Sequence, residues 1–130
     1  MSSYSIDAPL FVTKNKKGDR WWVNWNNINN SHHHQYNKCK HLFSEAVQPL
    51  LKDVGSAEEV ALVFTLYPPT KRRYDLSNVC GAVDKFFCDA LVTAGCIPDD
   101  DYKHVPDVRY LFGEVDKDNP RMQIEIIKRK

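Results

Sequence analysis

Residues 73–104 of this chain read RYDLSNVCGAVDKFFCDALVTAGCIPDDDYKH. Their apolar residues recur at helical spacing, which predicts a helix from about Ser77 to Ala94 that Gly95 ends. At 100° per residue one face of this helix is apolar and must pack inward. That face comprises Val79, Val83, Phe86, Phe87, Ala90 and Ala94.

Acidic residues stand at both ends of the predicted helix. Asp75 lies at its mouth, and the triplet Asp99–Asp101 follows its end, while Lys71–Arg73 flanks the first of these positions. If the chain folds back, the two acidic clusters meet, and converging carboxylates are how proteins hold a hard divalent cation. Carboxylates for a metal beside cations for phosphate indicate phosphodiester chemistry on a nucleic acid. The alternative is a solvated acidic loop after a helix that Asp75 or Ser77 caps.

The same stretch resembles the RusA family of phage-type Holliday-junction resolvases. That family carries Asp-x-Asp-Asn at a helix start, a Lys on the helix, then Asp-Ala-Leu, a Gly-containing turn and Asp-Asp. The matching residues, over about a quarter of the chain, are Asp75, Ser77 and Asn78, then Asp89-Ala90-Leu91, Gly95, and Asp99-Asp100. The resemblance implies a metal held by Asp75 and Asp100, with Asp99 or Asp101 as accessory ligands.

Two departures from the family pattern bear on the site. Ser77 stands where the family has its second carboxylate, and the helix is about four residues longer, roughly one added turn. Counting forward from Asn78 puts the family Lys at Gly81, whereas counting back from Asp89 puts it at Lys85. The resemblance leaves both positions open. Asp84, at the edge of the apolar face, is a further carboxylate that could replace the one lost at Ser77, although a partner on the preceding helix is the favoured expectation.

Helix geometry favours Lys85. Asn78, Gly81, Lys85 and Asp89 form a narrow polar stripe, and helical side chains lean toward the N-terminus, so Lys85 is expected to lie back over Gly81. Its ammonium could then approach the site of Asp75. The alternative is a surface Lys paired with Asp89 at i+4.

Composition points to one soluble domain spanning residues 1–130. No run approaches the ~20 apolar residues of a membrane span, and no signal peptide precedes it, so a cytoplasmic location and no membrane partner are expected. Four cysteines without Cys-x-x-Cys spacing predict reduced, mostly buried thiols. The net charge of +1 hides a division, because residues 75–118 hold ten acidic and four basic side chains, a balance of −6 that leaves +7 elsewhere. A local negative site among basic segments suits metal-dependent work on a polyanion.

The order of predicted elements is β-β-α-β-α-β-β, a single α+β domain with two helices packed on a mixed or antiparallel sheet. Strands are predicted at 5–12 and 20–25, joined by a basic hairpin tip that carries Lys14, Lys16 and Lys17. A polar connection follows at 26–31, then a helix from Ser31 to about Leu51 that Pro49 kinks or ends. A buried strand is predicted at 59–67, and strands at 108–114 and 122–127 read as a closing antiparallel hairpin.

Two further clusters have competing interpretations. His32, His33 and His34 suggest a metal site, but consecutive helical residues point in different directions, so phosphate contacts are the favoured expectation. Trp21 and Trp25 share one face of their predicted strand and Trp22 takes the other. One face is expected to join the core, and the other to stack on bases or to form a dimer interface.

The resemblance and the charge pattern together predict a Mg²⁺-dependent, structure-selective endodeoxyribonuclease that cuts four-way or other branched DNA, with Mn²⁺ as a possible substitute. Asp75, Asp100 and Lys85 are the expected catalytic residues. The expected DNA contacts are Lys71, Arg72, Arg73, Lys14, Lys16, Lys17 and Asn78. A homodimer and a phage or prophage source in a bacterial host are implied by the resemblance. The alternatives are a junction-binding protein with weak or no activity, because Ser77 removes a ligand, and a protein-interaction module on the same fold.

Overall fold

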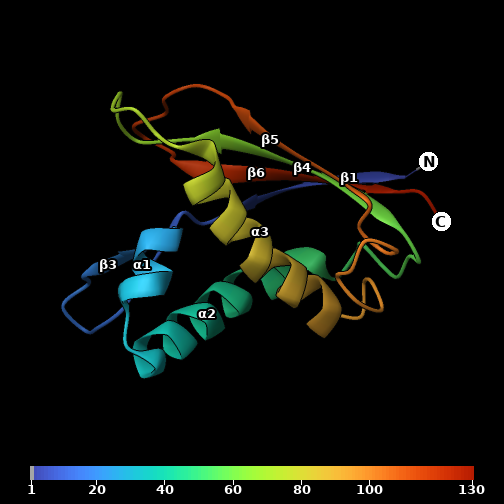
Figure 1. The fold of residues 1–130 in the computed structure, drawn as a ribbon, viewed down its shortest axis with the longest axis horizontal. Helices are drawn as coiled ribbons and strands as arrows, with labels where there is room; N and C mark the ends of the chain where they lie inside the picture. Colours follow the sequence, from blue (N-terminus) through green and yellow to red (C-terminus); the bar gives the residue numbers. More distant parts are fainter. Residues whose placement is uncertain (1) are drawn as a thin grey trace.

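A computed structural model describes residues 2–130 of the chain. Four strands form a mixed sheet in the order β1-β6-β4-β5 (Figure 1). Their bounds are β1 (Ser3–Ala8), β4 (Val60–Tyr67), β5 (Asp107–Phe112) and β6 (Arg121–Lys128). The apolar strand β4 lies inside the sheet, where neighbours on both sides satisfy its backbone. The predicted α+β class and mixed sheet are confirmed.

The predicted closing hairpin is wrong, because β4 separates β5 from β6. β5 pairs with β4 in parallel, and β6 pairs with β4 on the other side, antiparallel. A parallel return needs a crossover connection, and the helix α3 (Leu76–Thr93) supplies it. Two strand patterns joined by a turn-rich loop look like a hairpin locally, and nothing in either pattern shows a third strand between them.

The N-terminal segment is broken into more elements than its pattern indicates. The strand expected at 5–12 divides near Pro9 into β1 and β2 (Phe11–Thr13), and β2 pairs with β3 (Arg20–Trp22). The polar connection at 26–31 is instead the helix α1 (Trp25–Asn30). It forms because the Asn24 side chain caps it, accepting the Asn27 backbone N–H at 2.8 Å.

The helices close to their predicted positions are α2 and α3. α2 (His33–Val47) begins after His32, not after Ser31, and Pro49 converts its continuation into the 3-10 turn η1 (Gln48–Leu51). α3 ends before Gly95, whose φ of 77° only glycine adopts readily.

Among the described helices, α3 makes the main contacts with the four-stranded sheet, on β4 and β5. α3 crosses one sheet face, and α2 lies on the far side of α3 and also contacts β2 (Figure 1). Phe86 of α3 joins these layers: Trp21 stacks on its ring with centroids 6.1 Å apart, and Phe43 of α2 meets its edge. All four cysteines are buried free thiols, as predicted. Within the described chain, no helix has the length and apolar character needed to cross a membrane.

Candidate functional site

Asp75 is the N-terminal cap of α3. One of its carboxylate oxygens accepts the Ser77 backbone N–H at 3.1 Å and the Ser77 hydroxyl at 2.8 Å. The hydroxyl bond, more than the backbone bonds, holds the pKa of Asp75 below its ordinary value. This residue therefore stays ionised at the mouth of the helix and satisfies backbone donors there.

An acidic pocket of about 470 Å³ opens along the exposed stripe of α3. Asp84, Lys85 and Asp100 supply its charged groups, and its remaining lining is Trp25, Ser77, Gly81, Cys88 and Tyr110. Two predicted site residues, Lys85 and Asp100, thus meet in one hollow. Asp75 does not line it, although its bonding partner Ser77 does.

Asp84 is the carboxylate that sequence reasoning undervalued. The Tyr110 hydroxyl donates to one of its oxygens at 2.7 Å and the Cys88 thiol to the other at 3.1 Å. The expectation that Asp84 pairs with a residue of the preceding helix is wrong. Its partner is Tyr110, because β5 runs parallel to β4 and brings Tyr110 beside α3. Burial, and next the bond to Asp84, raises the pKa of Tyr110, so its hydroxyl remains a donor. The sequence feature that could have identified Asp84 as a site residue is its position next to Lys85, at the boundary of the apolar face of the helix.

The three aspartates of the acidic triplet have different hydrogen-bond partners. Asp99 accepts the backbone N–H of Asp100 at 2.8 Å, and Asp101 caps the next turn by accepting the backbone N–H of Lys103 at 3.1 Å. Of the three, only Asp100 lines the acidic pocket. Partial burial, and next the carboxylate of Asp89, raises the pKa of Asp100 above its ordinary value.

Lys85 is exposed and forms no ion pair with any described residue. Asp89, its suggested i+4 partner, is instead bound by Lys40 of α2 at 2.8 Å. The space over Gly81 is not an open path for Lys85, because a Cβ there would lie 2.7 Å from the indole nitrogen of Trp25. Gly81 therefore admits the Trp25 ring, and the Lys85 ammonium is free to turn into the acidic pocket.

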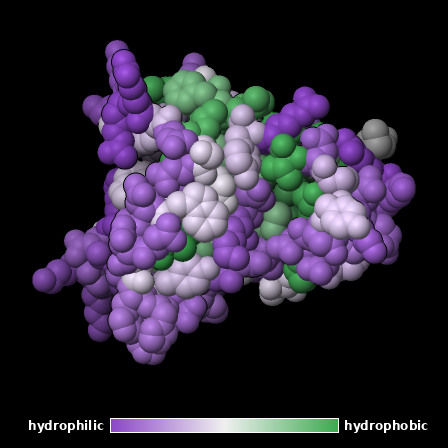
Figure 2. Space-filling view, viewed as in Figure 1, coloured by the Kyte–Doolittle hydropathy of each residue, from purple (hydrophilic) through white to green (hydrophobic). Residues whose placement is uncertain are grey.

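A second hollow, the basic cleft, lies at the start of α3, where Asp75 and Asn78 line the cleft and Ser77 lines the acidic pocket. Its volume is about 640 Å³, and Arg72, Arg73, Asp75 and Asn78 are among its lining residues. The exposed loop from Lys71 to Arg73 protrudes from the molecule, as the hydrophilic projection in Figure 2 shows. The Arg72 guanidinium lies 5.0 Å from the Tyr74 ring centroid.

Asn78, which lines the basic cleft, is hydrogen-bonded to Trp25, which lines the acidic pocket. Its side-chain oxygen accepts the Trp25 backbone N–H at 3.0 Å, which fixes the start of α1 against α3. The remaining predicted DNA contacts, Lys14, Lys16 and Lys17, lie in the turn between β2 and β3, on the other side of α1 from the Lys71–Arg73 loop (Figure 1). Both basic segments flank α1 at the same end of the molecule.

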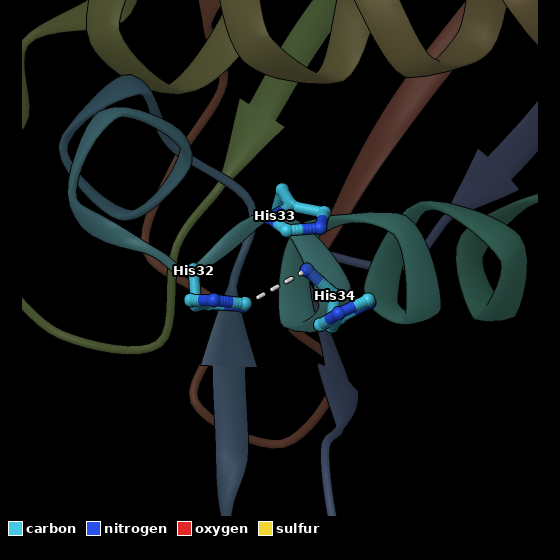
Figure 3. Close-up of side chains that lie close together, drawn as sticks. All are labelled: His32, His33 and His34. Atoms are coloured by element: carbon cyan, nitrogen blue, oxygen red, sulfur yellow. Dashed lines mark hydrogen bonds between the residues drawn. The ribbon is translucent and has the colours of Figure 1, made fainter.

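His32, His33 and His34 lie close together. One nitrogen from each ring lies within 4.8 Å of the other two, and all three side chains are exposed (Figure 3). The expectation that the three rings diverge is wrong: the His33 and His34 rings of α2 have centroids 4.1 Å apart, and the His32 ring lies 4.5 and 5.0 Å from them. His32 precedes the helix with an extended backbone.

The acidic pocket offers a pair of carboxylates, Asp84 and Asp100, rather than a closed cage. Within residues 2–130, the histidine cluster is the sole set of three His, Cys, Asp or Glu ligand atoms this close together. A hard dication that keeps several waters and uses one or two carboxylates suits such a pair. No protein-family model matches the chain, and no curated protein matches its sequence.

Proposed function

We propose that the protein is a RusA-like, Mg²⁺-dependent endodeoxyribonuclease acting on four-way or related branched DNA. The observation that carries this proposal is that α3 lines both the acidic pocket and the basic cleft, through alternating residues of its first turns. The cleft provides cations for the phosphate backbone, and the pocket provides carboxylates and a free lysine for one phosphodiester. The resemblance of residues 73–104 to the RusA family supplies the reaction class.

The donor chemistry of the acidic pocket fits Mg²⁺, and Mn²⁺ as a substitute, because Asp84 and Asp100 both present carboxylate oxygens. When bound, such an ion activates water and shields charge on the scissile phosphate. Tyr110 orients Asp84 through its hydroxyl, and Asp75 holds Ser77 at the pocket rim. Lys85 places a positive charge where the pentavalent transition state becomes more negative. Asp99 and Asp101 shape the loop that presents Asp100.

The decisive experiment incubates purified protein with an end-labelled four-way junction, with and without Mg²⁺ or Mn²⁺. A linear duplex of the same sequence is the matched substrate control. Paired nicks near the branch point that require metal support the proposal. Tight junction binding without cleavage identifies a catalytically inactive junction binder, and binding to neither DNA leaves a protein-interaction module.

Replacing both Arg72 and Arg73 with Ala is expected to weaken junction binding and to flatten its salt dependence. Each lost phosphate contact removes counterion release, so the slope of log K against log salt falls by about 0.9 per contact. Fluorescence anisotropy at several salt concentrations measures this slope. The matched control replaces Lys52 and Lys130, two exposed cations that do not line the basic cleft, with Ala. If the two double variants show the same slope of log K against log salt, the DNA does not contact Arg72 and Arg73.

We also retain the homodimer that the resemblance implies, and we assign its interface to β5. The Trp-bearing strand is a poorer candidate, because Trp21 packs in the core and Trp22, on the other face, is half-buried against Phe11 and lines the basic cleft. β5 is an edge strand, and Val108, Leu111 and Phe112 expose 37 %, 48 % and 52 % of their surface. Figure 2 shows hydrophobic surface along this edge. Exposed apolar edge strands pair readily with another chain.

Two-fold symmetry restricts how two β5 strands pair. Facing residues of an antiparallel pair project to the same face, so even-numbered residues face even-numbered ones. Placing Tyr110 on the axis sets Val108 against Phe112 of the partner subunit. A register centred on Arg109 opposes two guanidinium groups instead, which is unfavourable. The Tyr110 register also brings the two acidic pockets close to the axis, as paired nicks across a two-fold junction require.

Phe112→Lys is expected to convert the dimer to a monomer at micromolar concentration. Each subunit would then place a charged side chain against Val108 of the partner subunit. Sedimentation velocity measures the mass. Tyr102→Lys, at a large side chain that is 77 % exposed and lies outside β5, is the control and should remain dimeric. A wild-type protein that sediments as a monomer with and without junction DNA contradicts the assignment.

A further inference from the structure

The histidine cluster, His32–His34, lies where the chain changes from extended to helical backbone. His32 has φ −60° and ψ 145°, and His33 is the first residue of α2. Three successive residues within a helix fan around its axis through about 200°. The His33 and His34 ring centroids nevertheless lie 4.1 Å apart, and the extended cap residue brings the His32 ring to 4.5 and 5.0 Å from them (Figure 3).

The donor set of this cluster consists of imidazole nitrogens alone. Such nitrogens bind borderline dications such as Zn²⁺, Ni²⁺ and Cu²⁺, whereas Mg²⁺ requires oxygen ligands. Three imidazoles on a tetrahedral Zn²⁺ have nitrogens about 3.3 Å apart, given Zn–N bonds of about 2.0–2.1 Å. The present spacing, within 4.8 Å, reaches that value by small side-chain rotations. The rings are exposed, so such rotations meet little resistance.

We propose that His32, His33 and His34 together bind one transition-metal dication of the Zn²⁺ class at the start of α2. Since all three ligands come from one short stretch, they occupy one side of the ion. Its remaining positions stay open to water or to an added oxygen ligand. The site is separate from the acidic pocket in both position and ligand type, so it does not depend on the proposed nuclease activity.

Ion binding at His32 is coupled to the helix start. Its Nδ1 accepts the His34 backbone N–H at 3.3 Å, and an imidazole that accepts at Nδ1 carries its proton on Nε2. Coordination by either nitrogen therefore costs His32 this cap bond: Nδ1 would use the lone pair that accepts it, and coordination by Nε2 would move the ring proton to Nδ1. His33 and His34 have no such obligation among the hydrogen bonds of the described residues. Removing either of them should thus cost more affinity than removing His32.

The test is isothermal titration of the untagged full-length protein with Zn²⁺. The expected result is one ion per chain, with His33→Gln and His34→Gln each weakening binding at least tenfold. His32→Asn keeps a good capping residue and should weaken binding less than these two. His41→Gln, at an exposed histidine of the same helix bonded to Glu45, is the matched control and should bind as wild type.

A triple variant with Gln at all three positions measures background binding by the four thiols and other groups. Cu²⁺ electron paramagnetic resonance supplies an independent count of nitrogen ligands, with three in the wild type and two in each single variant. Circular dichroism confirms that the variants are folded. The proposal is overturned if the single variants lose less than twofold in affinity, if the triple variant binds like wild type, or if His41→Gln weakens binding equally.

Discussion

Asp100→Asn is expected to lower Mg²⁺-dependent cleavage of a four-way junction by about two to three orders of magnitude, with binding retained. Asn nearly matches Asp in shape, so the loop that presents residue 100 should persist. It carries no charge and is a far poorer ligand for a hard dication. Removing this carboxylate also removes repulsion against phosphate, so metal-free binding should be equal or tighter. Single-turnover cleavage and anisotropy with the same labelled junction measure both effects.

The neighbouring carboxylates provide the controls for this variant. Asp99→Asn and Asp101→Asn keep the acceptor oxygens that hold the loop and should cleave within a few-fold of wild type, because neither residue lines the pocket. Asp84→Asn should match Asp100→Asn if these two carboxylates hold the ion. Asp75→Asn preserves the helix cap and is expected to be milder, since Asp75 reaches the pocket only through Ser77. Wild-type cleavage by both Asp84→Asn and Asp100→Asn would show that the acidic pocket is not an active site.

The pH profile of cleavage gives a second measurement on Asp100. The ion requires the ionised carboxylate, and partial burial with Asp89 nearby raises the pKa of Asp100. Activity should therefore begin to fall, on acidification, at a higher pH than an unperturbed aspartate would allow. Asp89→Asn removes the second of these causes, so the acidic limb should move to lower pH. If the acidic limb of the pH profile is unchanged in Asp89→Asn, the limb reports the titration of a group other than Asp100.

Lys85→Ala is expected to lower turnover by about two orders of magnitude while junction affinity changes little. The ammonium is exposed, lacks an ion-pair partner among the described residues and lines the same pocket as Asp84 and Asp100. Its charge is therefore available to the developing charge on the phosphate rather than committed to the fold. Rapid-quench cleavage at saturating protein separates turnover from binding.

Two variants make the Lys85 result specific. Lys85→Arg keeps a positive charge and should recover part of the activity. Lys40→Ala removes the cation that binds Asp89 on the same side of α3 and should cost less than Lys85→Ala, because Lys40 does not line the pocket. Near-normal cleavage by Lys85→Ala would make this residue an ordinary surface lysine.

The pattern of neighbouring residues in the sequence was enough to predict α3, its N-terminal cap and the buried strand β4. The apolar period of residues 79–94, Asp75 before it and Gly95 after it define the helix through interactions within a few residues. Among the three adjacent aspartates, the resemblance pointed to Asp100, which is the one that lines the acidic pocket. Capping by Asn24 was missed because a run of asparagines resembles a loop until one side chain is seen to cap the next turn.

Only the tertiary structure decided which distant residues share the acidic pocket. Tyr110 meets Asp84 because β5 returns parallel to β4, and that pairing depends on backbone contacts between strands about 40 residues apart. Trp25 covers Gly81 for the same kind of reason, since α1 is held on α3 by Asn78. The periodicity of apolar residues indicates which side of a helix or strand is buried, but it does not indicate the order of the strands in the sheet. The residues that strand order brings together are therefore visible only in the folded chain.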